Sequence, residues 1–169
     1  MKLLRHLLAI GLLPFVVTIV VPLYLVRDVG VSNTGWGLSP PLGLLPTLLG
    51  CVLVVVGVLL VYRTVYLFAT VGDGTLAPWD PPRRLVVQGV YRYVRNPMIS
   101  GVIFILAGEA MLFGSASLLV WFLVFWGINA LIMPLIEEPA LEERFGSDYR
   151  AYKRNVPRWI PRLRPWTPE

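Results

Sequence analysis

The sequence predicts an all-α fold: an integral membrane bundle of four transmembrane helices, followed by a cytoplasmic amphipathic helix near the C-terminus. Hydrophobic residues make up 56% of the 169 residues, a fraction that a water-soluble domain of this size rarely reaches. Four apolar windows are long enough to cross about 30 Å of hydrocarbon. Basic residues gather in the segments that would lie on one side of the membrane. We expect a single membrane-embedded domain over residues 1–169.

The predicted helices follow one another with short connections in the second half of the chain. The first span follows Lys2 and Arg5, and because it is long and lacks a small-residue cleavage site, we expect a retained helix rather than a signal peptide. The third span is the shortest, and the sequence GSAS joins it to the fourth in a tight hairpin. The expected helices cover about residues 7–26, 47–69, 98–114 and 116–136, and the cytoplasmic tail covers 137–169.

The distribution of basic residues predicts the orientation of the bundle. Loops rich in Lys and Arg stay on the cytoplasmic side of a membrane. The N-terminus, the loop between the second and third spans, and the tail are basic. The other connections between spans contain Arg27 as their single basic residue. The basic residues of the first three segments are Lys2, Arg5, Arg83, Arg84, Arg92, Arg95, Arg144, Arg150, Lys153, Arg154, Arg158, Arg162 and Arg164. We therefore expect both termini, and any active site built from these segments, to be cytoplasmic.

Charge and composition also narrow the range of partners. The net charge of +5 indicates membrane topology and attraction to anionic lipid. Nucleic acid is not expected, because the basic residues lie along membrane edges instead of on one soluble face. His6 is the sole histidine and Cys51 the sole cysteine, so a zinc site or a Cys-His nucleophile is not expected and no metal is predicted. The sequence does not indicate an oligomeric state.

Polar groups collect where the third span begins. The preceding loop, 71–89, is rich in glycine and proline, which indicates a segment of defined shape; the alternative is a plain connector. Pro97 suits the first turn of a helix, where its missing N–H is not needed, and Asn96 suits the N-cap. Arg95 beside the positive end of that helix would favour a carboxylate or phosphate. The alternative is an arginine that reaches lipid headgroups beside an ordinary cap.

A second set of polar residues follows the fourth span. Glu137 and Glu138 stand side by side at the expected membrane boundary, and adjacent carboxylates raise each other's proton affinity unless a cation is near. They would suit an ammonium-bearing ligand. The alternative is that they pair with Arg95 or favour the start of the next helix. That helix is predicted to be amphipathic because apolar residues recur at helical spacing: Leu141, Phe145, Tyr149, Tyr152 and Val156.

Two motifs resemble a known enzyme family. The stretch GVYRYVRNPMISG, residues 89–101, is followed about 36 residues later by EEPALEERFGSDYRAYKRNVPRWIPR, residues 137–162. Together they resemble the integral membrane methyltransferases that include the isoprenylcysteine carboxyl methyltransferases and the phospholipid N-methyltransferases. The resemblance covers about residues 47–162. Asn96 stands where the carboxyl methyltransferases have histidine, and Asn-Pro-Met is closer to the phospholipid enzymes.

The resemblance implies S-adenosylmethionine as the cofactor, held at the cytoplasmic mouth of the bundle. Arg95 would support the turn around it, and Glu137 with Glu138 would meet its amino group. Either glutamate would accept a proton from an amine acceptor through water, and the candidate catalytic residues are Glu138 and Arg95. The cofactor-binding residues that the resemblance implies are Leu85, Val86, Tyr91, Asn96, Pro97, Met98, Ile99 and Glu137.

We expect methyl transfer to a lipid-like acceptor at the membrane interface, either the amine headgroup of a phospholipid or an isoprenylcysteine-type substrate. A rival from another class is a small proton-coupled transporter that uses Glu109, within the third span. Such transporters usually carry an internal repeat, and none is visible in this sequence. A further alternative is a non-catalytic membrane scaffold with the same fold. Binding of the methyl donor separates an enzyme from a scaffold.

Overall fold

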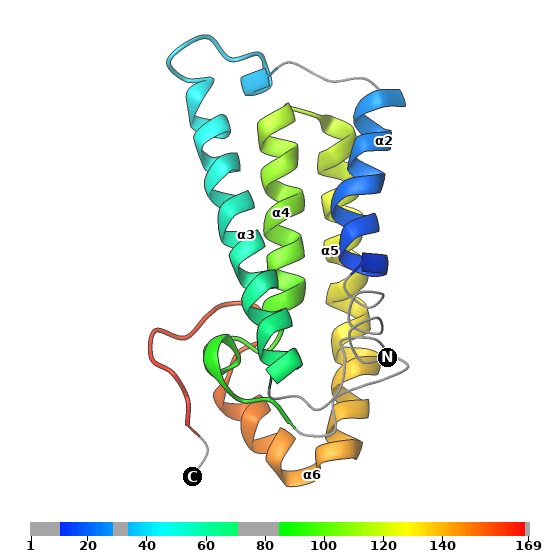
Figure 1. Cartoon of the computed structure of the whole chain (residues 1–169), viewed down its shortest axis with the longest axis vertical. Coiled ribbons are helices and arrows are strands. Elements are labelled where there is room, and N and C mark those ends of the chain that lie inside the picture. The colour runs from blue at the N-terminus through cyan, green and yellow to red at the C-terminus, as the bar shows by residue number, and fades with distance from the viewer. Residues whose placement is uncertain (1–10, 29–33, 71–84, 168–169) are drawn as a thin grey trace. The chain divides into compact units, whose positions relative to one another are not determined.

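The computed structural model describes residues 11–28, 34–70 and 85–167, and every regular element in these ranges is helical (Figure 1). The all-α prediction is confirmed for the described chain. Four of the basic residues that predict the orientation, Lys2, Arg5, Arg83 and Arg84, lie outside the described ranges. The elements, with η for π and 3-10 helices, are η1 (Gly11–Val20), α2 (Val21–Asp28), η2 (Thr34–Gly37), α3 (Leu44–Thr70), η3 (Gly89–Arg92), α4 (Pro97–Phe113), α5 (Ala116–Ile132), η4 (Met133–Glu137) and α6 (Glu138–Asn155).

Prolines mark two of the helix boundaries. The third predicted span corresponds to α4, which begins at Pro97, one residue earlier than expected. The fourth predicted span, 116–136, corresponds to α5 and most of η4, a π-helical stretch that contains Pro134. Proline lacks the N–H that an α-helical bond needs, so the helix widens locally where Pro134 occurs.

Two helical runs are long and apolar enough to cross a membrane by length and composition. One is Leu44–Leu67, and the other lies within the continuous run Ala116–Asn155. The helix α4 is apolar but shorter. The first predicted span, 7–26, is described only from residue 11, as η1 and α2. Four membrane spans and a cytoplasmic C-terminal helix therefore stay predictions.

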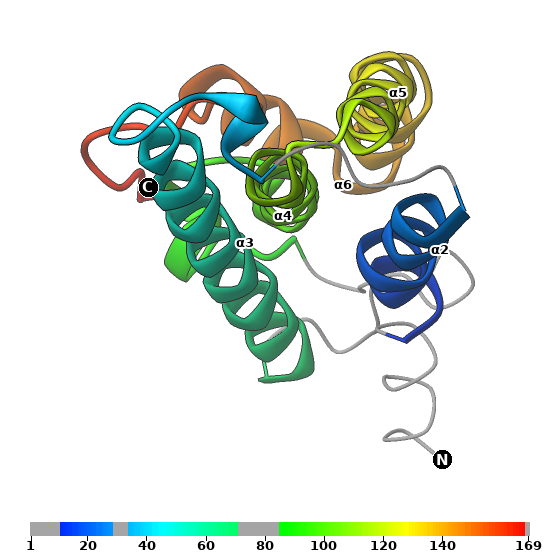
Figure 2. The ribbon, with the colours of Figure 1, turned by 90° about the horizontal axis from the view of Figure 1, so that it is seen from above.

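The described chain forms two compact units, and glycines set the packing inside one of them. This unit contains Gly11–Leu59 and Gly101–Ile128. A Cβ atom on Gly57 would lie 2.6 Å from the carbonyl oxygen of Gly101, in the facing helix. A Cβ atom on Gly50 would lie 2.8 Å from the carbonyl oxygen of Gly108. No side chain fits in such a contact, so small residues let α3 and α4 pack backbone to backbone (Figure 2).

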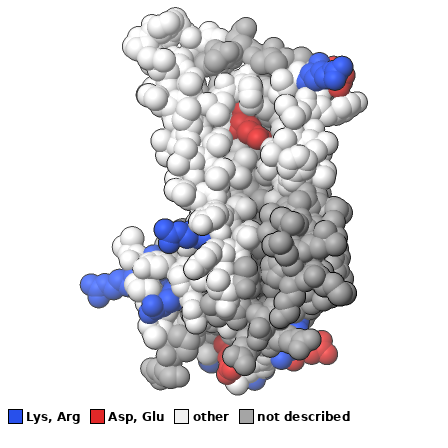
Figure 3. Space-filling view, in the orientation of Figure 1, with Lys and Arg blue, Asp and Glu red and all other residues white. Residues whose placement is uncertain are grey.

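A tryptophan ties η1 to α5 within the same unit. The Nε1 atom of Trp121 donates a hydrogen bond of 3.1 Å to the carbonyl oxygen of Val17. In a π-helix this carbonyl would pair with the residue five positions on, and Pro22 has no N–H to offer. The indole therefore supplies the missing donor. Large apolar side chains such as Leu48, Val52 and Leu59 are exposed along the part of α3 in this unit, and the face in Figure 3 shows uncharged side chains there.

The second unit, built from the described parts of Leu60–Ser100 and Asn129–Glu169, has its own hydrophobic core. The predicted apolar stripe of α6 forms its centre, with Tyr149, Tyr152 and Val156 no more than 3% exposed. Around them pack Leu85, Val87, Leu141, Phe145 and Trp166. The stripe is thus covered by the chain itself, because the segment before α4 and the C-terminal segment both fold over α6.

The C-terminal segment, 156–167, is hydrogen-bonded along the segment 91–95 that precedes α4. Three main-chain bonds join the two, from Arg95 N to Pro157 O (3.0 Å), from Arg162 N to Tyr93 O (2.9 Å) and from Trp166 N to Arg92 O (3.0 Å). The hydroxyl of Tyr152 donates a further bond of 2.7 Å to the carbonyl oxygen of Tyr91. These bonds fix the position of the residues that lead into α4.

Candidate functional site

The start of α4 is formed by four of the predicted site residues. Pro97 is fully buried and begins the helix, and Met98 and Ile99 lie half-buried in its first turn. Asn96 immediately precedes the helix, and its carbonyl oxygen accepts a hydrogen bond of 3.0 Å from the N–H of Ser100. This is the first bond of the helical series, so Asn96 occupies the predicted N-cap position.

Glu138, the first residue of α6, is buried and binds three cationic side chains. Its Oε1 atom lies 2.8 Å from Arg95 Nη1 and 2.5 Å from Arg158 Nε. Its Oε2 atom lies 3.3 Å from Lys153 Nζ. We call these four residues the Glu138 cluster. Pairing with Arg95, one of the alternatives that the sequence left open, is therefore what the structure shows for this glutamate.

A bend at Gly146 brings the side chain of Lys153 to Glu138. Gly146 has φ 55° and ψ −125°, which divides α6 into two arms. In a straight helix, residues 138 and 153 would lie about 22 Å apart along the axis. Their side chains meet at 3.3 Å because the second arm folds back toward the first. Side chains of L-residues rarely tolerate this backbone conformation, so glycine is required at the bend.

Replacing Gly146 with alanine is expected to lower the free energy of unfolding by about 1–3 kcal/mol, because an alanine there is held in a strained backbone conformation. The loss comes from strain and not from a clash, since a Cβ atom at Gly146 would meet no atom within 4 Å. Thermal unfolding of the purified protein in detergent measures it. Gly127→Ala in α5 is the matched control, because its Cβ atom would also meet nothing within 4 Å. Equal melting temperatures for the two variants would contradict the prediction.

The two adjacent glutamates have pKa values shifted in opposite directions. Burial alone would raise the pKa of Glu138, but the hydrogen bond from Arg158 and the charges of Arg95 and Arg158, helped by Lys153, hold it below the ordinary value of 4.5. Burial raises the pKa of Glu137 above 4.5, and the charge of Glu138 raises it further. Neighbouring carboxyl groups with such different environments often divide the roles of a functional site.

Replacing Glu137 with glutamine is expected to stabilise the protein at neutral pH. A carboxyl group whose pKa is raised by folding penalises the folded state as the pH rises above its unfolded value, and a neutral amide carries no such penalty. The gain should therefore shrink as the pH falls below about 4.5. Melting temperatures of the two proteins between about pH 3 and about pH 7 test this. A variant less stable than the parent at neutral pH would show that Glu137 has a structural partner.

Arg95 keeps an unused hydrogen-bond donor. Its side chain is 9% exposed, and its Nε atom is buried without a hydrogen-bond partner among the described residues. A buried donor left unsatisfied costs about 1–3 kcal/mol, so such groups often mark the place of a ligand. Glu137 forms no ion pair within the described ranges. The phenol of Tyr149 interacts with both Arg95 and Glu137. Its oxygen lies 3.5 Å from Arg95 Nη1. Burial raises the pKa of Tyr149, and the charge of Glu138 and then that of Glu137 raise it further.

The other predicted residues lie in the same unit but in different surroundings. Val86 is 5% exposed and Tyr91 is 8% exposed, so both belong to its core. Burial raises the pKa of Tyr91, with further contributions from Tyr152 and Glu137, which places this tyrosine within electrostatic reach of the site. Leu85 packs against the α6 stripe and borders a cavity. That these three residues bind a cofactor stays a prediction.

Sequence reasoning missed the contributions of Lys153 and Arg158. The sequence predicts both of them only as basic residues of the cytoplasmic tail. The available signal was Gly146, because a glycine in the middle of a charged helix permits a bend. No cluster of side chains suited to a metal occurs among the described residues.

A family model described as phospholipid methyltransferase matches residues 45–148. The chain belongs to the phospholipid methyltransferase family. The match covers more than half of the chain, from the start of α3 into the second arm of α6. It includes the start of α4 and both glutamates. The family resemblance predicted from the two motifs is thereby confirmed.

Two curated relatives are methyltransferases. The chain is 37% identical over 78 residues to a protein-S-isoprenylcysteine O-methyltransferase of Schizosaccharomyces pombe, covering 46% of this chain and 33% of that protein. It is 34% identical over 79 residues to protein-S-isoprenylcysteine O-methyltransferase B of Arabidopsis thaliana, covering 46% of this chain and 40% of that protein. The chain thus matches less than half the length of either relative. No solved structure matches it.

The transporter alternative finds no support in these comparisons, which name methyltransferases. Glu109, on which that alternative depended, lies in α4, and its Oε2 atom is buried without a hydrogen-bond partner among the described residues. Membership of a methyltransferase family makes an enzyme the better-supported class.

Proposed function

We propose that this phospholipid methyltransferase family member transfers the methyl group of S-adenosylmethionine to a lipid-like acceptor at the cytoplasmic surface of a membrane. The family match supports methyl transfer, and the apolar helices support a membrane location. The observation that carries the proposal is that one unit contains both a buried, unsatisfied donor, Arg95 Nε, and an acidic side chain, Glu137, that has no cationic partner within the described ranges.

The residues of this site fit the amino-acid end of S-adenosylmethionine. That end carries a carboxylate and an ammonium group. The free Nε donor of Arg95, next to the N-terminus of α4, suits the carboxylate. The carboxyl group of Glu137 suits the ammonium, and binding a cation would relieve the repulsion from Glu138 that raises its pKa.

In this proposal Glu138 is a positioning residue. Its carboxylate is occupied by Arg95, Arg158 and Lys153, and its lowered pKa makes it a weak proton acceptor. It holds the guanidinium of Arg95 beside the start of α4 and joins that start to both arms of α6. Such fixed placement is how proteins hold a donor and an acceptor at reacting distance.

S-adenosylmethionine supplies an electrophilic methyl group when bound. The protein must keep water away from that group and, if the acceptor is an amine, remove a proton from it. Glu137 is better suited to take the proton through water than Glu138, because three cations already occupy the carboxylate of Glu138. We therefore propose that Glu138, which the sequence analysis gives as a candidate catalytic residue, holds Arg95 in position. Glu137 is the residue that accepts the proton.

Two acceptor classes fit this chemistry. The family model names phospholipids, and both relatives are named for isoprenylcysteine. We favour the amine headgroup of a phospholipid, because Asn96 replaces the histidine of the carboxyl methyltransferases at the start of α4.

The proposal is tested with the full-length protein purified in a maltoside detergent. Calorimetry should detect binding of S-adenosylmethionine, and Arg95→Gln and Glu137→Gln should each weaken it by about tenfold or more. Glu143→Gln, an exposed position on α6, is the matched control and should bind the donor as the parent does. Incubation with methyl-labelled donor and total lipid extract should place label in a headgroup amine.

Other results would point to other functions. Label in a methyl ester would replace the amine acceptor with an isoprenylcysteine-type one. Absence of donor binding by the folded parent protein would indicate a scaffold. Proton-driven flux in liposomes that is abolished by Glu109→Gln would restore the transporter.

A further inference from the structure

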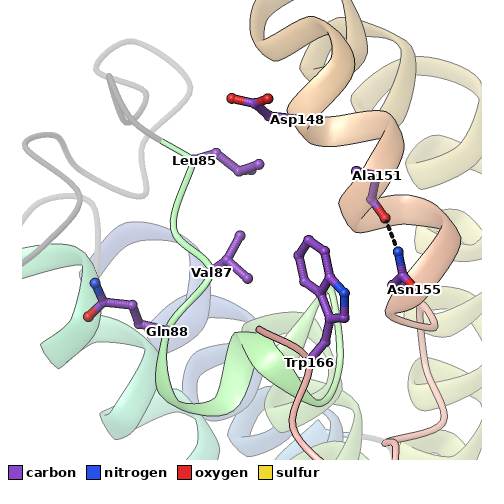
Figure 4. Close-up of a pocket in the computed structure, with 7 residues that line it drawn as sticks. All are labelled: Leu85, Val87, Gln88, Asp148, Ala151, Asn155 and Trp166. Carbon is purple, nitrogen blue, oxygen red and sulfur yellow. Dashed lines mark hydrogen bonds between the residues drawn. The ribbon is translucent and has the colours of Figure 1, made fainter. Parts of the chain in front are cut away.

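A second potential binding site lies on the other side of α6 from the Glu138 cluster. It is a cavity of about 580 Å³ within the unit that contains α6, in the size range of small-molecule pockets. Figure 4 shows Trp166 standing between Val87 on one side and Ala151 and Asn155 on the other. The lining residues are Leu85, Val87, Gln88, Asp148, Ala151, Asn155 and Trp166.

The cavity borders a different face of α6 from the one that reaches Arg95. Asp148, Ala151 and Asn155 follow one another at spacings of three and four residues, so they share one face of α6. The adjacent face carries Tyr149 and Tyr152, whose side chains are buried in the core. It is this core face that reaches Arg95, through the hydroxyl of Tyr149. Neither Arg95 nor Glu137 lines the cavity.

The charge of the lining is opposite to that of the whole chain. The protein carries a net charge of +5, yet among the described residues that line the cavity Asp148 alone is charged. Its carboxylate forms no ion pair within the described ranges, and it accepts a hydrogen bond of 3.4 Å from the hydroxyl of Ser147. A carboxylate without an ion-pair partner among the described residues, at the edge of a cavity whose other described lining residues are uncharged, attracts cations and repels anions.

The walls suit an organic cation better than a hydrated metal ion. Leu85, Val87 and Ala151 are aliphatic, and Trp166 adds the face of an indole ring. The quadrupole of an indole ring attracts alkylammonium groups. Apolar walls can contact the methyl or methylene groups of the same cation. Trp166 is held in place before any ligand arrives. Its main-chain N–H donates to the carbonyl oxygen of Arg92, its own carbonyl oxygen accepts a hydrogen bond of 2.7 Å from Arg92 Nε, and its ring contacts that of Tyr152 at 5.9 Å between centroids.

We propose that this cavity binds a compact alkylammonium cation, held by the carboxylate of Asp148 and the ring of Trp166. Of the residues predicted to bind the donor, Leu85 alone also borders this cavity, and binding of a cation there does not depend on methyl transfer. The ammonium group can belong to a free small molecule or to a lipid headgroup, and the experiment below separates these sources.

The probe is choline, titrated into the full-length protein in a maltoside detergent without any methyl donor. We expect weak saturable binding, with a Kd of about 1 mM. The uncharged analogue 3,3-dimethylbutan-1-ol should bind at least about fivefold more weakly, because it keeps the shape and loses the charge. Asp148→Asn should weaken choline binding by a similar factor, and Glu143→Gln, an exposed carboxylate on the same helix, should leave it unchanged.

Several outcomes would overturn the proposal. These are equal binding of choline and its uncharged analogue, unchanged binding after Asp148→Asn, and loss of S-adenosylmethionine binding in Asp148→Asn to the same extent as choline binding. The last would make the cavity part of the donor site. Asp148 is exposed, so its replacement should not unfold the protein; Trp166→Phe, which keeps an aromatic wall, tests the ring.

The source of the cation is decided by comparing free choline with lysophosphatidylcholine in nanodiscs of otherwise uncharged lipid. Competition by the lipid that depends on Asp148 supports the proposal with a headgroup as the ligand. Binding of free choline without competition by the lipid supports it with a free cation as the ligand. Failure of both, while S-adenosylmethionine still binds, overturns this proposal and leaves the methyltransferase function standing.

Discussion

Replacing Glu138 with glutamine is expected to lower the free energy of unfolding by about 3–5 kcal/mol at neutral pH. The carboxylate is 3% exposed and balances three cations, so its loss leaves the buried guanidinium of Arg95 without a counter-charge. It also releases the contact between the start of α4 and the two arms of α6. Chemical unfolding followed by tryptophan fluorescence measures the change.

The same variant should lose S-adenosylmethionine binding by about tenfold or more, because Arg95 is no longer held in place. Glu142→Gln is the matched control. Glu142 pairs with Lys153 at 3.6 Å and with Arg150 at 3.9 Å, but these side chains are partly exposed, and such pairs contribute about 0–1 kcal/mol. If Glu138→Gln were no more destabilising than Glu142→Gln, the Glu138 cluster would not be the centre of this unit.

Alanine in place of Gly57 should destabilise the protein by about 1–3 kcal/mol or more, because it overpacks the contact between α3 and α4. The new Cβ atom would lie 2.6 Å from the carbonyl oxygen of Gly101 and 2.9 Å from the backbone nitrogen of Ile105. Backbone atoms cannot move aside as the end of a flexible side chain can, so the helices must separate. Thermal unfolding in detergent is the measurement.

The control for this variant is Gly127→Ala, which makes the same chemical change in α5. A Cβ atom there would meet nothing within 4 Å, and alanine is the better helix former, so we expect no loss of stability. Similar destabilisation by both variants would attribute the effect of Gly57→Ala to helix formation in general instead of to the contact with Gly101.

The elements that could be predicted from sequence are those with a local signature. Long apolar windows predicted α3 and α5, and Pro97 after a suitable cap predicted where α4 begins. The pairing of Arg95 with Glu138 was one of the alternatives that the two adjacent carboxylates left open. Each of these inferences needs only a short stretch of chain and a general rule about solvent or backbone.

The parts that could not be predicted depend on contacts between distant segments. A straight α6 would have kept Lys153 far from Glu138, and the positive φ of Gly146 is a fact of the folded chain. The close contact of Gly57 with Gly101 needs knowledge of which helices are neighbours. The apolar stripe of α6 was visible in sequence, but its partners Leu85, Val87 and Trp166 were not, because they come from segments with no periodicity of their own.

The attachment of residues 157–166 to residues 92–95 is made by peptide groups, which every amino acid except proline supplies in full. Apart from Arg158 and Trp166, whose side chains contact Glu138 and the core, this part of the protein should therefore tolerate many changes of side chain while being sensitive to changes of length. One residue inserted between Arg162 and Trp166 would put each later amide out of step with its acceptor. Comparison of related sequences should accordingly show varied composition here, with few insertions or deletions.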